Sequence, residues 1–233
     1  MDADSALVHD VRAQVAAYYS GKIARHGVTP MGVDWSCAPT QQLRFVQLLK
    51  VCDFSRPFSL NDVGCGYGAL LQYLDDRHAT TGIDYLGIDL SAAMIRRARR
   101  RWAGRGDAHF MLGHASPRVA DFTVASGVFN VKLDCRIDLW RQLTAQALTN
   151  MRDTSRRGFA VNFMTFRPHH EATHPGLFRT LPDEWISYCE TRLGLEVELV
   201  SDYGMHEFTL LIRPRDQVAS SSRRARSRSS MSP

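Results

Sequence analysis

The residues best suited to chemistry form one short glycine-rich turn, Asn61-Asp62-Val63-Gly64-Cys65-Gly66-Tyr67-Gly68. Glycines at every second position let the backbone turn sharply and leave bare peptide groups open to a ligand. An apolar run precedes the turn and a helical pattern follows it, so the turn opens a helix whose first N–H groups have no partner within the helix. The pattern therefore predicts a binding site for a nucleotide-like ligand.

A second acidic residue, Asp89, ends the next apolar run along the chain. A carboxylate there can accept hydrogen bonds from both hydroxyls of a ribose that lies across the strand ends. The glycines follow Gly-x-Gly-x-Gly spacing, not the Gly-x-Gly-x-x-Gly of dinucleotide-binding folds, and Asp62 lies two residues before them. The Asp62 carboxylate would repel a pyrophosphate and attract the ammonium of an amino-acid group. An NAD-linked oxidoreductase therefore fits poorly.

Short apolar runs that alternate with longer helical patterns would position this turn. Strands are expected at residues 58–63, 83–89, 108–112, 121–126 and 157–163. Helices are expected at residues 68–77, 91–102, 134–152 and 182–193, with two more at about 5–25 and 39–51. Alternating strands and helices imply parallel strands joined by right-handed crossovers, hence a doubly wound sheet.

The C-terminal part of the pattern differs from the rest. Residues 195–201 and 206–213 are two predicted strands, joined only by Asp202-Tyr203-Gly204-Met205. A link this short makes an antiparallel hairpin, because parallel neighbours need a crossover of a dozen residues or more.

The segment from Asp62 to Gly68 resembles motif I of the class I S-adenosylmethionine-dependent methyltransferases, and Asp89 falls where that family has its ribose-binding acid. Residues 121–128, Asp-Phe-Thr-Val-Ala-Ser-Gly-Val, are similar to the family's fourth-strand motif, which passes under the cofactor. The terminal hairpin matches its reversed final strand, and the resemblance covers about residues 55–213. It implies an α/β, doubly wound Rossmann-like sheet of seven strands in the order 3-2-1-4-5-7-6, with the last strand antiparallel. It also implies S-adenosyl-L-methionine as cofactor.

The resemblance assigns cofactor contacts to particular positions. Asp62 would face the methionine ammonium and Asp89 would hold the ribose, while a small Cys65 side chain suits the turn without a nucleophilic role. The remaining expected contacts are Gly64, Gly66 and Gly68 in the turn, Leu90, Met94, His114 and Ala115 around the adenine, and Ser126 and Gly127 beneath the methionine.

Residues 1–54 are predicted to form a helical cap ahead of a core that spans residues 55–216. In the family this region commonly covers the cofactor and helps to enclose the substrate. Tyr19 and Trp35 would place aromatic faces beside the sulfonium, and Arg44 would pair with the methionine carboxylate. The alternatives are ordinary packing for Trp35 and a solvated helix face for Arg44.

The acceptor is expected to be a small molecule, with methyl transfer to an N, O or C nucleophile, in secondary metabolism. The segment Ser126-Gly127-Val128-Phe129-Asn130 lacks the Pro-Pro-aromatic run of nucleic-acid amino-methyltransferases, and no Pro-Cys nucleophile marks a cytosine-C5 enzyme. An RNA methyltransferase that uses the basic tail, and a cofactor-binding protein without catalysis, remain the alternatives. Where the acceptor needs a base, the candidates are His170, His174 and His206.

Charge and composition favour a cytoplasmic protein that binds no membrane. The chain has 233 residues and a net charge of +5, of which the Ser/Arg-rich residues 217–233 supply +4, so a near-neutral body precedes a disordered basic tail. No apolar run approaches the length of a membrane span, and the acidic N-terminus does not resemble a signal peptide. The five cysteines form no CxxC pair, and no metal site is expected.

Overall fold

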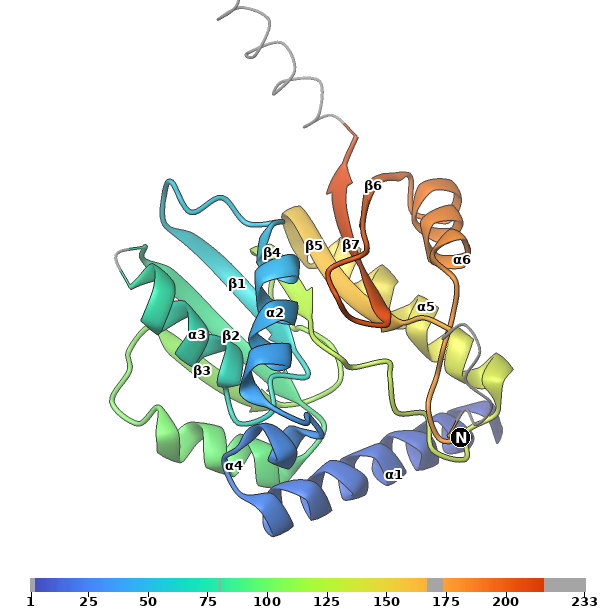
Figure 1. The fold of residues 1–233 in the computed structure, drawn as a ribbon, viewed down its shortest axis with the longest axis horizontal. Helices are drawn as coiled ribbons and strands as arrows, with labels where there is room; N and C mark the ends of the chain where they lie inside the picture. The colour runs from blue at the N-terminus through green and yellow to red at the C-terminus, as the bar shows by residue number, and fades with distance from the viewer. Residues whose placement is uncertain (1–2, 80, 167–173, 216–233) are drawn as a thin grey trace, which may run out of the picture.

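The computed structural model describes residues 3–79, 81–166 and 174–215. Their centre is a seven-stranded sheet in the order β3-β2-β1-β4-β5-β7-β6 (Figure 1), which confirms the predicted order. Strands β1 to β5 run parallel, and β7 is antiparallel to both β5 and β6. The strands are β1 (Phe58–Val63), β2 (Ile83–Asp89), β3 (Ala108–Leu112), β4 (Ala120–Ala125), β5 (Ser155–Met164), β6 (Leu195–Val200) and β7 (Glu207–Pro214).

The helices begin and end within a few residues of the predicted positions. Ser91 caps α4, accepting a hydrogen bond from the Met94 N–H at 3.2 Å. The helix expected over residues 182–193 is α6 followed by a π-helical turn, η2. The helical segments are α1 (Ala3–His26), η1 (Pro30–Val33), α2 (Ala38–Leu49), α3 (Ala69–His78), α4 (Ala92–Arg101), α5 (Ile137–Asp153), α6 (Pro182–Ser187) and η2 (Tyr188–Arg192).

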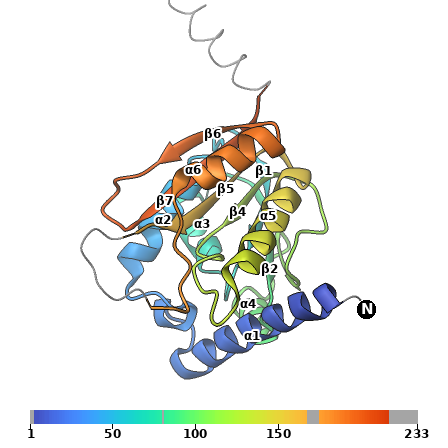
Figure 2. The same ribbon diagram turned by 90° about the vertical axis from the view of Figure 1, so that its right-hand side faces the viewer.

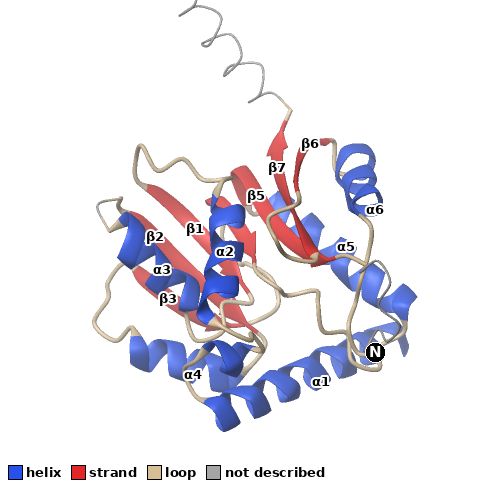
Figure 3. Ribbon diagram, in the orientation of Figure 1, coloured by secondary structure: helices blue, strands red, loops and turns tan. Residues whose placement is uncertain are grey.

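Alternating side chains of the strands build two cores, one on each face of the sheet. In β1, Phe58 and Leu60 pack with apolar residues of α2, α3 and α4, whereas Val63 joins the core beneath α5 and α6. Figure 3 shows these helices as layers on either side of the strands. The central strands are therefore buried on both faces, which leaves the ends of the strands as the place for a ligand.

Helix α1 lies across the end of the sheet where the parallel strands finish (Figure 2). Its Ser20 hydroxyl shares a hydrogen bond of 2.8 Å with Ser91 at the start of α4. The segment after it is tied back by Asp34, whose carboxylate accepts from Tyr18 at 2.6 Å and from Lys22 at 2.5 Å. The N-terminal segment therefore covers the carboxyl ends of the parallel strands, which is where open α/β sheets bind ligands. Among the described residues, no helix is both long and apolar enough to cross a membrane.

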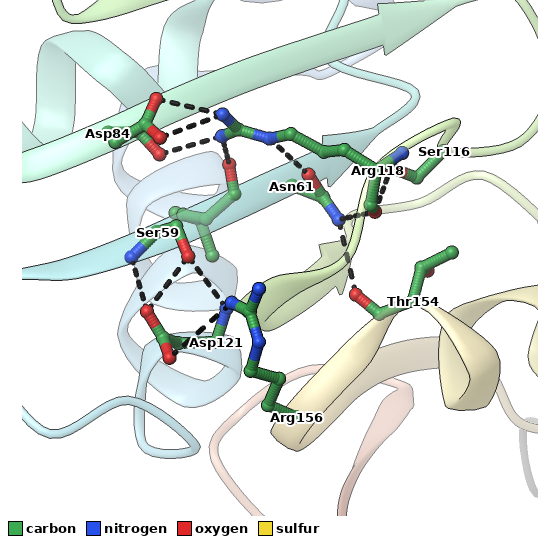
Figure 4. A network of polar contacts seen from close by, with 9 residues as sticks. Ser59, Asn61, Asp84, Ser116, Arg118, Asp121, Thr154 and Arg156 are labelled. Atoms are coloured by element: carbon green, nitrogen blue, oxygen red, sulfur yellow. Dashed lines mark hydrogen bonds and ion pairs between the residues drawn. The ribbon is translucent and has the colours of Figure 1, made fainter.

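A polar network joins β1 and β2 away from the carboxyl ends of these strands (Figure 4). The Arg118 guanidinium donates to both carboxylate oxygens of Asp84, at 2.9 and 2.8 Å, and to the Asp84 carbonyl at 2.8 Å. Its Nε also donates to Asn61, which is fully buried. Arg118 thus satisfies polar groups of two adjacent strands, and its removal would leave the Asn61 amide oxygen without that donor.

We expect Arg118→Met to destabilise the protein, because it removes charge-assisted hydrogen bonds of a partly exposed side chain. The expected loss in the free energy of unfolding is about 1–2 kcal/mol, measured by urea denaturation at pH 7. Arg136→Met is the control, since the Arg136 side chain is 82% exposed and lies 3.9 Å from its acidic neighbour. Equal stabilities for the two variants would contradict this account of the network.

Candidate functional site

A cavity of about 290 Å³ lies between α1 and the carboxyl ends of the parallel strands. Its walls come from α1, the segment around η1, the turns that follow β1 to β4, and one side of α5. Small-molecule sites are commonly of this size and place. The cavity brings together all the predicted cofactor residues except Gly68 and Arg44: Tyr19, Trp35, Asp62, Gly64, Cys65, Gly66, Asp89, Leu90, Met94, His114, Ala115, Ser126 and Gly127.

The glycine turn after β1 is shaped by contacts that no other residue would permit. Gly64 has φ 76°, and a Cβ there would lie 2.4 Å from the Val128 side chain. Gly66 has φ 56°, and a Cβ there would lie 2.8 Å from Val33, which follows α1. The positive φ values and the close approach of two cavity walls together explain why glycine occupies both positions.

Asp89 fixes the turn as well as facing the cavity. Its Oδ2 accepts a hydrogen bond from the Gly66 N–H at 2.9 Å, and its Oδ1 accepts from the Ser91 N–H at 2.8 Å. Burial raises the pKa of this carboxyl to about 6, against the opposing effect of the two backbone donors. Each oxygen keeps a second lone pair with which to accept from a ligand hydroxyl.

Asp62 is the more deeply buried carboxylate of the pair. The Tyr85 hydroxyl donates to its Oδ2 at 2.5 Å, and the side chain is almost wholly enclosed. Burial raises the pKa of Asp62 to about 7, and the nearby charge of Asp89 adds to that shift, while the Tyr85 hydrogen bond opposes it. Neither carboxylate has a cationic partner among the residues that the structure describes, and two such buried groups in one cavity favour a ligand that carries positive charge.

Beyond the carboxylates the cavity is largely apolar. Val11 and Val15 of α1 face it from one side, and Leu143 and Ala147 of α5 face it from another. Sequence reasoning missed these walls, because an apolar position on an amphipathic helix reads the same whether it meets the core or a cavity. Other lining residues outside the predicted set include Val33, Gln41, Phe45, Val128, Phe129 and Trp140.

Gly68 has a local structural role. It has φ 82° and precedes the first residue of α3, with its N–H donating to the Cys65 carbonyl at 2.9 Å. A Cβ there would lie 2.4 Å from the Trp102 ring nitrogen. Gly68 therefore precedes the helix and packs against Trp102, the C-cap residue of α4, and Phe110 of β3, and it does not line the cavity.

Arg44 differs from both readings that the sequence allows. It is fully buried, so it forms no solvated helix face. Its Nε donates to Glu207 Oε2 at 2.6 Å, and its Nη2 pairs with the other carboxylate oxygen. The guanidinium also lies 3.1 Å from the centre of the Trp35 ring. A protein carboxylate thus takes the place expected for the methionine carboxylate, and only Nη1 has no hydrogen-bond partner among the described residues.

Neither of the two candidate bases that the structure describes lies at the cavity. His174 is exposed, and its Nδ1 accepts from the Gly176 N–H at 3.2 Å. His206 is exposed at the start of the final strand, and neither residue lines the cavity. His170 lies outside the described residues, so a base among these three stays a prediction. Within the ranges that the structure describes, no group of three or more His, Cys, Asp or Glu side chains could hold a metal ion.

Sequence comparison identifies relatives of this chain. A family model described as a methyltransferase domain matches residues 61–152, the part that contains the glycine turn, Asp89 and most of α5. A curated protein of Mycobacterium tuberculosis, "Putative methyltransferase Rv1506c", is 40% identical over 165 residues, which cover 71% of this chain and 98% of that protein.

Solved structures share the fold at low sequence identity. Phosphoethanolamine N-methyltransferase 1 of Haemonchus contortus aligns with a TM-score of 0.62 at 12% identity, over 88% of this chain and 50% of that one. Magnesium protoporphyrin IX methyltransferase of Synechocystis aligns with a TM-score of 0.56 at 13% identity, over 76% and 82%. With the relative above, the strand order and the glycine turn, these likenesses lead to one conclusion. The chain belongs to the class I S-adenosylmethionine-dependent methyltransferases.

Proposed function

We propose that the cavity under α1 binds S-adenosyl-L-methionine and that the protein methylates an N, O or C nucleophile of a small molecule, in secondary metabolism. The observation that carries this proposal is the pair of enclosed carboxylates beside the glycine turn. Asp62 and Asp89 both have raised pKa values because burial penalises their charge. A cationic, ribose-containing ligand would add a positive charge and further donors to the hydrogen bonds that the carboxylates already accept from the protein.

The residues of this cavity match the parts of the cofactor. Asp62 suits the methionine ammonium, and Asp89 suits the two ribose hydroxyls. Leu90 and Met94 provide apolar contact for the adenine, with Gly113, His114 and Ala115 at its edge, and Ser126 and Gly127 lie on the methionine side. The bare backbone at Gly64 and Gly66 allows the ligand to approach the turn closely.

Methyl transfer needs alignment and exclusion of water more than acid–base chemistry. The cofactor supplies an electrophilic methyl group on a sulfonium that leaves readily. The protein would contribute the cover of α1 and the aromatic rings of Tyr19 and Trp35, which line the cavity and can face a sulfonium. Holding an acceptor in line under this cover lowers the barrier by fixing its orientation.

The place of the methyl end favours a small acceptor. An acceptor would have to reach it beneath α1 and beside Trp35, between walls that also line the cofactor cavity. The two fold neighbours are named for phosphoethanolamine and for magnesium protoporphyrin IX, which are both small molecules. Phenols, amines and carboxylic acids are the classes of acceptor to test first.

Transfer of a tritiated methyl group from S-adenosylmethionine would test the acceptor class. We expect label in one or more small-molecule pools and none in RNA. Label in RNA that disappears after truncation at Arg215 and falls steeply with salt would instead indicate an RNA methyltransferase. Cofactor binding with no turnover across all pools would indicate a protein that binds the cofactor without catalysis.

Asp89→Ala should weaken cofactor binding, because it removes the acceptor of two ribose hydroxyls and loosens the turn at Gly66. We expect binding of S-adenosylhomocysteine to weaken roughly 30-fold or more, measured by isothermal titration calorimetry. Asp84→Ala, at the other end of the same strand, is the matched control and should bind as the wild type does. Tight binding of NAD, or undiminished affinity in Asp89→Ala, would refute the assignment.

Asp62 should make the unliganded protein less stable as the pH rises. Its pKa is about 7 in the folded protein and near 4 when unfolded, so the unfolded chain loses its proton first. The contribution of Asp62 to stability is therefore greatest below about pH 4 and falls until about pH 7, by up to about 4 kcal/mol. Urea unfolding from pH 5 to pH 8 should show a shallower fall in Asp62→Asn than in the wild type. Parallel pH profiles of the two proteins would contradict the raised pKa.

A further inference from the structure

The ion pair between Arg44 of α2 and Glu207 of β7 is buried far from water. The Arg44 side chain is 0% exposed and that of Glu207 is 5% exposed. Removing two charges from water costs free energy that their attraction need not recover, so such a pair is weak support for stability alone. The pair is better explained by the geometry that it imposes on its neighbours.

One set of hydrogen bonds connects this ion pair to the loop after β4. Glu207 Oε2 accepts a hydrogen bond from the Asn162 amide at 3.0 Å as well as from Arg44. Asn162 in turn accepts from the Gly127 N–H at 2.8 Å through its Oδ1, and its side chain is fully buried. The Glu207 carboxylate thereby orients Asn162, whose amide oxygen fixes the backbone of a cavity-lining residue.

A second contact connects the ion pair to the N-terminal cap. The Arg44 guanidinium stacks on the Trp35 ring, with 3.1 Å between its carbon and the ring centre. The Trp35 ring lies against Gly127, where a Cβ would be 2.8 Å from Trp35 Cζ2. One carboxylate therefore determines the positions of two touching residues of the cavity wall, Trp35 from the cap and Gly127 from the core.

We infer that Glu207 is a positioning residue for the amino-acid end of the cofactor, acting through Arg44 on Trp35 and through Asn162 on Gly127. This inference rests on the proposed placement of the methionine beside Gly127. The nucleoside end is formed by other groups: Asp89 is held by the Gly66 and Ser91 N–H groups, and Leu90 follows it on the chain. Loss of the Glu207 network should therefore weaken contacts to the methionine part and leave the nucleoside part unchanged.

The test compares two ligands by calorimetry, S-adenosylhomocysteine and adenosine, which lacks the amino-acid part. The variant is the double substitution Arg44→Met with Glu207→Leu, because either single change would leave an uncompensated buried charge. We expect its affinity for S-adenosylhomocysteine to fall at least tenfold and its affinity for adenosine to change less than twofold. Asn162→Ala, which removes only the hydrogen-bonded connection to Gly127, should shift the ratio of the two affinities in the same direction.

Arg157→Met is the matched control. Arg157 also joins β5 to the chain beyond α2, pairing with Asp53 at 2.9 Å and stacking on Phe122 at 4.8 Å, but at the amino end of β5. It should lower the stability and leave both affinities unchanged.

An equal loss of affinity for both ligands in the double variant, or wild-type affinity for both, would overturn the inference. If the double variant does not fold, an unchanged affinity ratio in Asn162→Ala overturns it. Wild-type protein that binds adenosine but not S-adenosylhomocysteine would refute the proposed function itself, and the inference with it.

Discussion

The site depends on the burial of two carboxylates at the carboxyl ends of two adjacent strands. Asp62 and Asp89 lie at the carboxyl ends of adjacent parallel strands, and both are removed from water by the cover above them. Such groups are costly unless a cation or a hydrogen-bond donor reaches them. The protein satisfies Asp89 with two backbone N–H groups and Asp62 with one tyrosine hydroxyl, and it leaves the remaining capacity for a ligand.

The cover is as important to this burial as the sheet. Helix α1 and the segment after it lie over the strand ends, with Asp34 tying the two together and Ser20 meeting the start of α4. On the far side, the buried pair of Arg44 and Glu207 joins the cap to the last strand. The same contacts that exclude water from the cavity therefore also set the position of its walls.

The sequence predicts the parts of the structure that depend on local spacing. The turn from Asp62 to Gly68 lies between a strand and a helix as expected, Asp89 ends the next strand, and the strand order is confirmed. The pairing of Arg44 with Glu207 could not be foreseen, because the partners are 163 residues apart and neither lies in a recognisable motif. The cavity walls of α5 were missed for a different reason: amphipathic periodicity shows that one side of a helix faces inward and does not show what that side meets.

Proton release on cofactor binding tests the central claim most directly. Calorimetry of S-adenosylhomocysteine at pH 6, repeated in buffers of different ionisation enthalpy, reports the number of protons exchanged. If the ligand ammonium meets a carboxyl whose pKa is about 7, binding should expel close to one proton from Asp62, and Asp89, whose pKa is about 6, should add part of a second. Asp62→Asn should release distinctly less. Tight binding with no proton release in the wild type would contradict the account, in which the ligand ammonium ionises a protonated Asp62.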